Sequence, residues 1–325
     1  MTDLLVADLH ISPYKRDAYR LEFLAKLGKL ARKHNADYIF ILGDLTDQKD
    51  EHKSELVNAV VDCLVDVVAE DVGVVILKGN HDYKDPSSPY FGFLRNIEYV
   101  EYISEPTYMG RTLLLPHTSN YKRDWGKLKF NKDLDRIYTH NTFKGATSES
   151  GQELDGIPLD AMPYRIPVYS GDVHKPQIMS NLTYVGAPYL IDFGDDFRPR
   201  CLLVDDKYHK SIQLDGPQKR VIQMHSDSVS AGFAGKAKEG DIVRVELSMR
   251  PEDYSRWSEL RERIIQMCHR FKFKLDSIRP IMEPAEKNTA KVKQQPSRTD
   301  KQVLLDYCKY NEIDKDTRDL GLELL

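Results

Sequence analysis

Short apolar runs alternate with longer amphipathic segments through the first third of this chain. The runs at residues 4–6, 38–42 and 74–77 have the length and composition of buried strands. Between them, residues 17–34 and 53–69 carry apolar side chains at helical spacing, which predicts two amphipathic helices. The order strand–helix–strand–helix–strand predicts a parallel sheet.

Side chains that can bind metals follow each of these runs, where the strand should end. The motifs are Asp8-Leu9-His10, Gly43-Asp44-Leu45-Thr46-Asp47 and Gly79-Asn80-His81-Asp82. A fourth motif, Gly171-Asp172-Val173-His174, follows a short apolar run at 167–169, and His140-Asn141 lies between the third and fourth motifs. Carboxylates and imidazoles just past buried strands are how an α/β sheet builds a site at its carboxyl edge.

The order of these motifs resembles that of the calcineurin-like metallophosphoesterases, which carry D-x-H, G-D-x-x-D, G-N-H-D/E, H and G-H-x-H. The one departure is Asp172, where the family usually has His. The resemblance implies an α/β fold: a layered β-sandwich core flanked by helices and followed by a small α/β capping domain. Strands near 112–116 and 137–139 are then expected to belong to the second sheet.

The resemblance also implies a role for each motif residue. One divalent metal would be held by Asp8, His10, Asp44 and His174, and a second by Asp44, Asn80, His140 and Asp172, so that Asp44 bridges the two. His81 would be catalytic without binding metal, because it faces the phosphate and can protonate the leaving oxygen. Asp82 would orient the His81 ring. A carboxylate at Asp172 favours Mn²⁺, with Mg²⁺ as the second choice, over Zn²⁺.

Later motifs are similar to those of a subgroup of the family, the SbcD-type DNA repair nucleases. These motifs are His174-Lys175-Pro176-Gln177, Val185-Gly186-Ala187-Pro188 and Asp192-Phe193-Gly194-Asp195. Gln48-Lys49 follows Asp47, where the Ser/Thr protein phosphatases carry Arg-Gly. The resemblance thus implies a DNA exonuclease or endonuclease that acts in DNA end processing, recombination or repair.

The same resemblance, together with the polar composition of 284–300 and the apolar stripe of Val303, Leu304 and Tyr307, divides the chain into four segments. These are a nuclease domain at 1–215, a DNA-capping domain at 216–283, a linker at 284–300 and a tail at 301–325. In the capping domain, the pattern predicts strands at 241–247 and 272–281 around a helix at 251–270. The resemblance implies that the tail binds an SbcC-type ATPase, and a homodimer is expected. A second interpretation is that the apolar face of the tail folds back on the catalytic domain.

The composition of the chain narrows the class of protein and its expected cellular location. The chain has 325 residues, 41% of them hydrophobic and 30% charged, which is ordinary for a globular protein with two domains. No apolar run approaches the ~20 residues of a membrane span, and no leader-like segment opens the chain. A cytoplasmic location is therefore expected, in the host cytoplasm if a phage encodes the protein. The four cysteines form no CxxC pair.

Two points remain open at the level of sequence. Residues 121–132 interleave basic and aromatic side chains, which can track a DNA backbone and stack a base or can simply form a solvated surface. His117 and five other histidines match no family ligand and are interpreted as surface or structural residues. A small-molecule phosphodiesterase or phosphatase, and a non-catalytic scaffold that binds a partner, are the alternative functions.

Overall fold

A computed structural model of the protein describes residues 1–130, 133–206, 208–229, 233 and 235–283, together with eight single residues between 301 and 322. Met1–Met282 form one compact unit and Glu283–Leu325 a second. The predicted linker at 284–300 lies outside the described residues, as does most of the predicted tail at 301–325. Among the described helices, none is long and apolar enough to cross a membrane.

The first sheet contains the three strands expected from the N-terminal apolar runs. Its members are β1 (Asp3–Val6), β2 (Tyr38–Ile41), β3 (Gly73–Leu77), β4 (Val100–Ile103), β11 (Arg200–Val204) and β12 (His209–Gln213). Their order is β12-β11-β1-β2-β3-β4. The strands from β1 to β4 pair in parallel, which confirms the predicted parallel core, and β11 returns to pair antiparallel with β1.

Two helices cover the outer face of this sheet. They are α1 (Ala18–Lys33) and α2 (Ser54–Val68), and a 3₁₀ turn at Lys15–Asp17 precedes α1. Leu24 and Leu27 of α1 and Val60 and Leu64 of α2 are fully buried against the strands. Each such side chain contributes roughly 1.5–3 kcal/mol by leaving water. Both helices lie within a residue of their predicted ends because their apolar spacing follows the helical period.

The second sheet holds the later strands. It is built from β5 (Thr107–Met109), β6 (Thr112–Leu115), β7 (Arg136–His140), β8 (Val168–Gly171), β9 (Gln177–Met179) and β10 (Leu182–Tyr184), in the order β5-β6-β7-β8-β10-β9. The four central strands are parallel, and the two edge strands pair antiparallel. A short helix, α3 (Tyr121–Trp125), and 3₁₀ turns at Tyr90–Asn96 and Leu159–Ala161 lie in the connections.

The two sheets pack face to face. Leu5, Phe40 and Val75 of the first sheet share one buried cluster with Leu114 and Tyr138 of the second. The rings of Phe40 and Tyr138 meet edge to face, with their centroids 4.7 Å apart. Alternate residues of the first sheet face the helices instead, so both of its faces are buried. This arrangement confirms the predicted layered sandwich.

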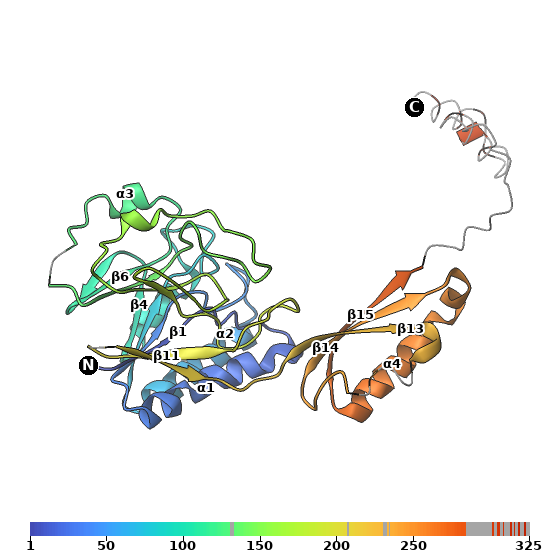
Figure 1. Cartoon of the computed structure of the whole chain (residues 1–325), viewed down its shortest axis with the longest axis horizontal. Helices are drawn as coiled ribbons and strands as arrows, with labels where there is room; N and C mark the ends of the chain where they lie inside the picture. Colours follow the sequence, from blue (N-terminus) through green and yellow to red (C-terminus); the bar gives the residue numbers. More distant parts are fainter. Residues whose placement is uncertain are drawn as a thin grey trace. The chain divides into compact units, whose positions relative to one another are not determined.

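A third, all-parallel sheet lies within the range predicted for the capping domain. Its strands are β13 (Lys219–His225), β14 (Ile242–Met249) and β15 (Lys274–Met282), and α4 (Trp257–Phe271) connects β14 to β15 (Figure 1). Residues Ser226–Ser228 and Pro251–Arg256 are 3₁₀ turns, so α4 begins later than predicted. The sequence prediction missed β13, whose first residues, Lys219 and Arg220, are charged.

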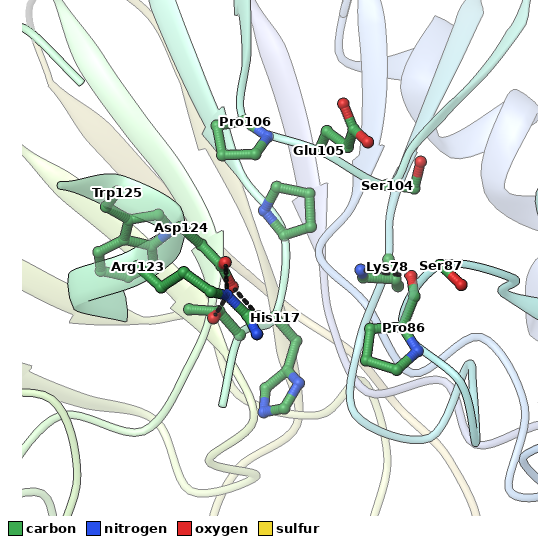
Figure 2. Close-up of a pocket in the computed structure, with 12 residues that line it drawn as sticks. Lys78, Pro86, Ser87, Ser104, Glu105, Pro106, His117, Arg123, Asp124 and Trp125 are labelled. Carbon is green, nitrogen blue, oxygen red and sulfur yellow. Dashed lines mark hydrogen bonds and ion pairs between the residues drawn. The ribbon is translucent and has the colours of Figure 1, made fainter. Parts of the chain in front are cut away.

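The carboxyl ends of the central strands in both sandwich sheets point to the same edge of the molecule. Two pockets open there. One, of about 370 Å³, is lined by residues that follow β3, β4 and β6 and by residues of α3 (Figure 2). The other, of about 380 Å³, is lined by residues that follow β6, β7 and β8.

Candidate metal centre

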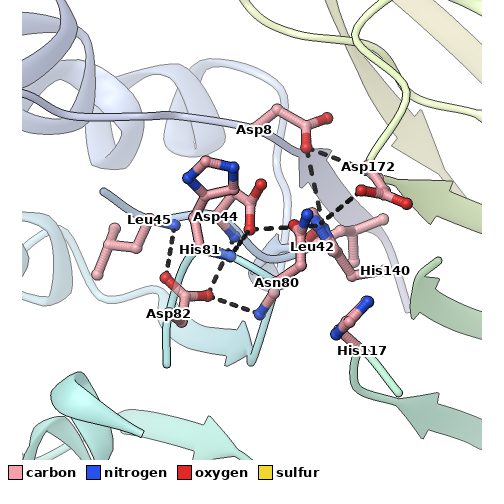
Figure 3. Close-up of polar contacts among 12 residues, drawn as sticks. Asp8, Leu42, Asp44, Leu45, Asn80, His81, Asp82, His117, His140 and Asp172 are labelled. Carbon is pink, nitrogen blue, oxygen red and sulfur yellow. Dashed lines mark hydrogen bonds and ion pairs between the residues drawn. The ribbon is translucent and has the colours of Figure 1, made fainter. Parts of the chain in front are cut away.

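All seven predicted metal ligands come together at this edge. Each follows or ends a strand: β1, β2 and β3 of the first sheet, and β7 and β8 of the second. They are Asp8, His10, Asp44, Asn80, His140, Asp172 and His174, and each contacts at least one other member of the set. Figure 3 shows five of them: Asp8, Asp44, Asn80, His140 and Asp172. The position of these residues at strand ends therefore brings their side chains together, and their role as metal ligands stays a prediction.

The backbone at these positions is unusual. Asp8, His10, Asp44 and Asp172 have φ values of 58°, 42°, 53° and 77°, in the left-handed region that non-glycine residues rarely adopt. Such conformations cluster at functional sites, where the surrounding structure must hold them. Here the chain turns sharply at each strand end, and the turn aims a carboxylate or imidazole at its partners from the other strands.

Two buried side chains hold the loop that contains Asp8 and His10. The guanidinium of Arg20 donates to the His10 carbonyl at 2.6 Å, and the Tyr189 hydroxyl donates to the Leu9 carbonyl. Both side chains are almost fully buried. They explain how the strained turn after β1 keeps its shape. Gly79 has a similar supporting role, because a Cβ there would collide with the Asp44 carboxylate.

One half of the site is built around His10. Its Nε2 lies 3.2 Å from Nε2 of His174 and 3.5 Å from Oδ2 of Asp44. Burial lowers the pKa of His10 to about 3, so its imidazole is neutral. Nearby, Oδ2 of Asp8 is buried without a hydrogen-bond partner among the described residues. Unpaired buried lone pairs are costly unless something binds them.

The other half is built around His140, which is fully buried. Its Nε2 lies 3.3 Å from Oδ1 of Asp44, 3.0 Å from the Asn80 amide and 3.8 Å from Oδ1 of Asp172. Its Nδ1 contacts the Leu42 carbonyl at 2.5 Å, which fixes the ring. Burial alone would lower the pKa of His140, but the surrounding carboxylates, Asp44 foremost, hold it well above its usual value.

Asp44 stands between the two halves, with one carboxylate oxygen toward each histidine. Burial would raise its pKa, yet His140 and His10 lower it below the usual range, so the group is ionised. By contrast, burial raises the pKa of Asp8 to about 6. A cation at this site would favour the ionised form of Asp8 and the neutral form of His140.

These residues fit divalent cations. Three sets of side chains each bring their ligand atoms within 4.8 Å of one another: Asp8–His10–His174, His10–Asp44–His81 and Asp8–Asp44–His140. Asp8, His10 and Asp44 each belong to two of these sets, and Asp44 lies between His10 and His140. The donors are carboxylate oxygens and imidazole nitrogens, which suit first-row divalent metals. Five of the seven predicted ligands therefore belong to sets that could hold a divalent ion, together with His81.

Asp172, the departure from the family pattern, points into the site. Its backbone N–H donates to Oδ1 of Asp8 at 3.0 Å, and its Oδ2 accepts from the Thr142 hydroxyl. The other carboxylate oxygen faces His140. The Thr142 hydroxyl thus holds the carboxylate in one orientation through a hydrogen bond.

His81 lies beside His10, with ring centroids 4.9 Å apart. Its Nδ1 contacts the Asp47 carbonyl at 3.1 Å. Distance alone allows His81 either to bind metal or to act on the phosphate, since it belongs to one of the three ligand sets. The proposed catalytic, non-ligand role stays a prediction.

Asp82 does not orient the His81 ring as we expected; the contact to that ring comes from Asp47. The Asp82 carboxylate is fully buried and accepts hydrogen bonds from the backbone N–H groups of Asp44, Leu45 and Gly79, at 3.1, 3.1 and 2.6 Å (Figure 3). Burial, together with the Asp44 charge, raises the pKa of Asp82 to about 7. Asp82 therefore ties the turn after β2 to the turn after β3.

His117 lies near the metal centre, although we interpreted it from the sequence as a surface or structural residue. It accompanies the Asn80–His140 pair in Figure 3, and its ring centroid lies 6.3 Å from that of His140. Its Nδ1 lies 2.7 Å from the Tyr83 hydroxyl, and burial and His140 lower its pKa to about 4. The available signal was its position just past an apolar run, Leu113-Leu114-Leu115, like the other site residues. Glu149, 3.8 Å from Nδ1 of His174, had no such signal.

The loop at 121–132 does not expose its aromatic side chains as the base-stacking interpretation requires. Trp125 is buried, and Tyr121 and Phe130 pack partly against the same core cluster. The lysines at 122, 127 and 129 and the arginine at 123 are exposed. The described part of this loop thus presents cations to solvent while its aromatic rings face the core. Residues 131 and 132 lie outside the described part.

Comparison with known proteins agrees with this geometry. The family model "Calcineurin-like phosphoesterase" matches residues 1–198. Among solved structures, a nuclease MPE from Pseudomonas putida is 18% identical, with 65% of this chain and 73% of that chain covered and a TM-score of 0.29. A dimetal phosphatase from Danio rerio is 11% identical, with 66% and 99% covered and a TM-score of 0.36. No match was found among curated proteins.

The family model spans more than half of the chain, and its match contains every strand that carries a predicted ligand. The side chains that phosphoester hydrolysis with divalent metals requires are assembled at one edge of the sandwich. On these grounds the chain belongs to the calcineurin-like phosphoesterases, which hydrolyse phosphoester bonds.

Proposed function

We propose that this phosphoesterase is a metal-dependent DNA nuclease of the SbcD type that uses two divalent ions, with Mn²⁺ preferred. The observation that carries the proposal is the exposed basic segment at 122–129, which stands beside the metal centre. Arg123 lines the same pocket as His117, and His117 is the neighbour of His140.

The basic segment suits a polyanion better than a small substrate. Lys122, Lys127 and Lys129 are exposed, and no carboxylate of the described residues lies within ion-pair distance of them. The whole chain has a net charge of −4, so this positive segment is a local feature. Local basic patches attract nucleic acid through its phosphates, in a salt-dependent way.

The proposed function assigns the site residues to two metal ions. Asp8, His10, Asp44 and His174 would hold one cation, and Asn80, His140 and Asp172, with Asp44, the other. When bound, such ions polarise the phosphate and supply a nucleophile near neutral pH.

His81 is the proposed proton donor. The Asp47 carbonyl can accept a hydrogen bond from a proton on Nδ1 of His81. A His81 imidazolium would then carry its second proton on Nε2. That proton can then pass to the leaving oxygen of the strand.

The partners stay proposals. The third sheet would guide DNA toward the metals, and the tail at 301–325 would bind an SbcC-type ATPase in a complex that contains two copies of this chain. This assembly would serve DNA end processing, recombination or repair in the cytoplasm.

The test compares substrates. Purified protein is incubated with end-labelled linear duplex DNA, single-stranded DNA, bis(p-nitrophenyl) phosphate and p-nitrophenyl phosphate, each with Mn²⁺, Mg²⁺ or EDTA. We expect metal-dependent cleavage of DNA and of the diester. Efficient hydrolysis of the monoester without cleavage of either DNA would instead support the small-molecule phosphatase alternative.

A further inference from the structure

We propose that the pocket of about 370 Å³ beside the metal centre receives one unpaired nucleotide of the DNA strand, next to the phosphate that is cleaved. This inference rests on the proposed nuclease function and deepens it, because it names the part of the substrate that is recognised and the strand state that the enzyme requires. The volume lies in the usual range of ligand pockets, ~300–1,000 Å³.

The pocket lies between the two sheets at the catalytic edge. One wall follows β3 and β4 and carries Lys78, Ser87 and Ser104; the opposite wall is formed by Arg123 and Asp124 of α3 (Figure 2). The backbone fixes this geometry, because the His117 N–H donates to the Lys78 carbonyl at 2.8 Å. The residue that precedes the Gly79–Asn80 turn therefore joins the pocket to the metal centre directly.

The pocket communicates with the metal centre through His117 and Thr118. Both residues also line the second pocket, which Asp172 borders. A DNA strand whose scissile phosphate lies at the metals could therefore pass His117 and extend into the first pocket.

Lys78 is the feature that points to a ligand. Its side chain is about 5% exposed, and its ammonium faces the pocket (Figure 2). The ammonium donates to the Pro86 carbonyl at 3.2 Å and lies over the Tyr83 ring, 5.0 Å from the centroid. Among the described residues, no carboxylate lies within 4 Å of it. The charges of Asp124, Glu105 and Asp82 act on it from farther away. A buried ammonium with three donors and no direct ion pair fits a phosphate.

The remaining walls fit a nucleoside. Pro86, Pro106, Pro116 and Trp125 supply apolar surface, which suits the face of a base. Arg123 is paired with Asp124 at 2.5 Å, and the Asp124 carboxylate also accepts from the Thr118 hydroxyl at 2.5 Å. Arg123 thereby compensates the charge of Asp124, so this pair does not repel a phosphate held by Lys78 on the opposite wall. Glu105 adds a second carboxylate to the lining of the pocket.

A base enclosed between these two walls cannot stay stacked and paired in a duplex, so the inference specifies the strand state. The enzyme should act on single-stranded DNA or on frayed ends. A fully paired substrate must first be opened, at a cost of a few kcal/mol per base.

The test uses the full chain and two pocket variants. Lys78→Met removes the charge, and Ser87→Trp fills the pocket from the exposed segment 84–88, which contains no proposed ligand. For each variant, kcat/KM is measured on a single-stranded oligonucleotide and on bis(p-nitrophenyl) phosphate. We expect kcat/KM on the oligonucleotide, divided by kcat/KM on the diester, to fall roughly ten- to a hundredfold, the scale of a lost hydrogen bond to a charged group. Lys26→Met, an exposed lysine on α1, is the matched control and should keep the wild-type ratio.

A series of oligonucleotides with a single abasic site at successive positions tests the base contact. In the wild-type protein, one position near the cleaved bond should raise KM, and Ser87→Trp should abolish this sensitivity. If no position is sensitive, only a phosphate is bound and the nucleotide assignment is wrong. If both pocket variants keep the wild-type ratio, the pocket inference fails while the nuclease proposal stands. If the wild-type protein cleaves the diester but no DNA, the proposed function itself fails.

Discussion

The Nε2 atoms of His10 and His174 lie 3.2 Å apart, and the two rings meet edge-on. Burial keeps His10 neutral by lowering its pKa to about 3. Two imidazole nitrogens that face each other this closely can form one hydrogen bond between them, or both can bind the same cation. The neighbouring carboxylates of Asp8 and Asp44 favour the second arrangement.

The first prediction concerns Asp44. In Asp44→Asn, the carboxylate that lies between His10 and His140 is lost, so the protein should lose bound metal and DNA cleavage together. Metal content by mass spectrometry and turnover of labelled DNA provide the two measurements. Asp66→Asn, at an exposed position of α2, is the matched control. An Asp44→Asn protein with full metal content and Mn²⁺-dependent activity would show that the bridging assignment is wrong.

The second prediction separates catalysis from metal binding at His81. If His81 acts on the leaving group, His81→Ala should keep both metals and its affinity for DNA. Turnover should fall roughly 10²–10⁴-fold, the scale of a lost general acid. Because the structure also groups His81 with His10 and Asp44, the competing outcome is loss of a metal, which would make His81 a ligand.

The third prediction concerns Asp172. Asp172→His restores the usual residue of the family and should stay active, with its preference shifted away from Mn²⁺. Asp172→Ala should weaken the second metal by at least tenfold, since even changes around a ligand typically cost about 10–100-fold in affinity. Metal titration followed by calorimetry measures both effects. Unchanged affinity in Asp172→Ala would mean that the carboxylate serves only Thr142 and Asp8.

The fourth prediction is a dependence of metal stabilisation on pH. Burial raises the pKa of Asp8 from 3.8 to about 6 in the folded protein, so the folded form retains a proton that the unfolded chain has released. Without metal, stability from this group is therefore lost as pH rises between these two values. Metal binding must displace the proton, so the gain in melting temperature on adding Mn²⁺ should be larger at pH 7.5 than at pH 5.5.

The Mn²⁺ concentration is the same at both pH values and a hundredfold above the dissociation constant at pH 7.5, where the free energy of unfolding should rise by about 2.7 kcal/mol. Differential scanning calorimetry with Mn²⁺ or EDTA at each pH is the measurement. A gain that does not change across this range would exclude Asp8 as a ligand.

The fifth prediction concerns the tail. Deletion of residues 301–325 should leave the Mn²⁺-dependent nuclease of the free subunit intact and abolish co-purification with an SbcC-type ATPase. The physical reason is that a short helix is marginal alone and needs a surface to pack against. Circular dichroism and nuclease assays of the truncated protein decide the point. A truncated protein that unfolds would assign the tail to the catalytic unit instead.

The clustering of the proposed ligands could be predicted from the sequence because each one ends or follows a strand, and parallel strands bring their carboxyl ends to one edge. His117 obeys the same rule after β6, but no motif marks it. Strand β12, with His209 and Lys210 in a half-exposed setting, lacks the apolar run that reveals a strand. The role of Asp82 depends on three backbone donors from two turns, and a linear pattern cannot contain such a relationship.

The arrangement of side chains in the loop at 121–132 also could not be predicted from the sequence. Its composition indicates that basic and aromatic side chains are interleaved, but it does not show which of them face solvent. The burial of Trp125 depends on a core built by residues from other segments, including Phe143 and Ile157. Only the folded chain separates the exposed cations from the buried rings.

The most direct test of the central claim is cleavage of end-labelled linear DNA by wild-type and Asp44→Asn protein prepared in parallel, each stripped with EDTA and then supplied with Mn²⁺. The account predicts that stripped wild-type protein is inactive, that Mn²⁺ restores its cleavage of DNA, and that the variant stays inactive in both conditions. Cleavage by the stripped wild-type protein, or equal cleavage by both proteins after addition of Mn²⁺, would contradict it.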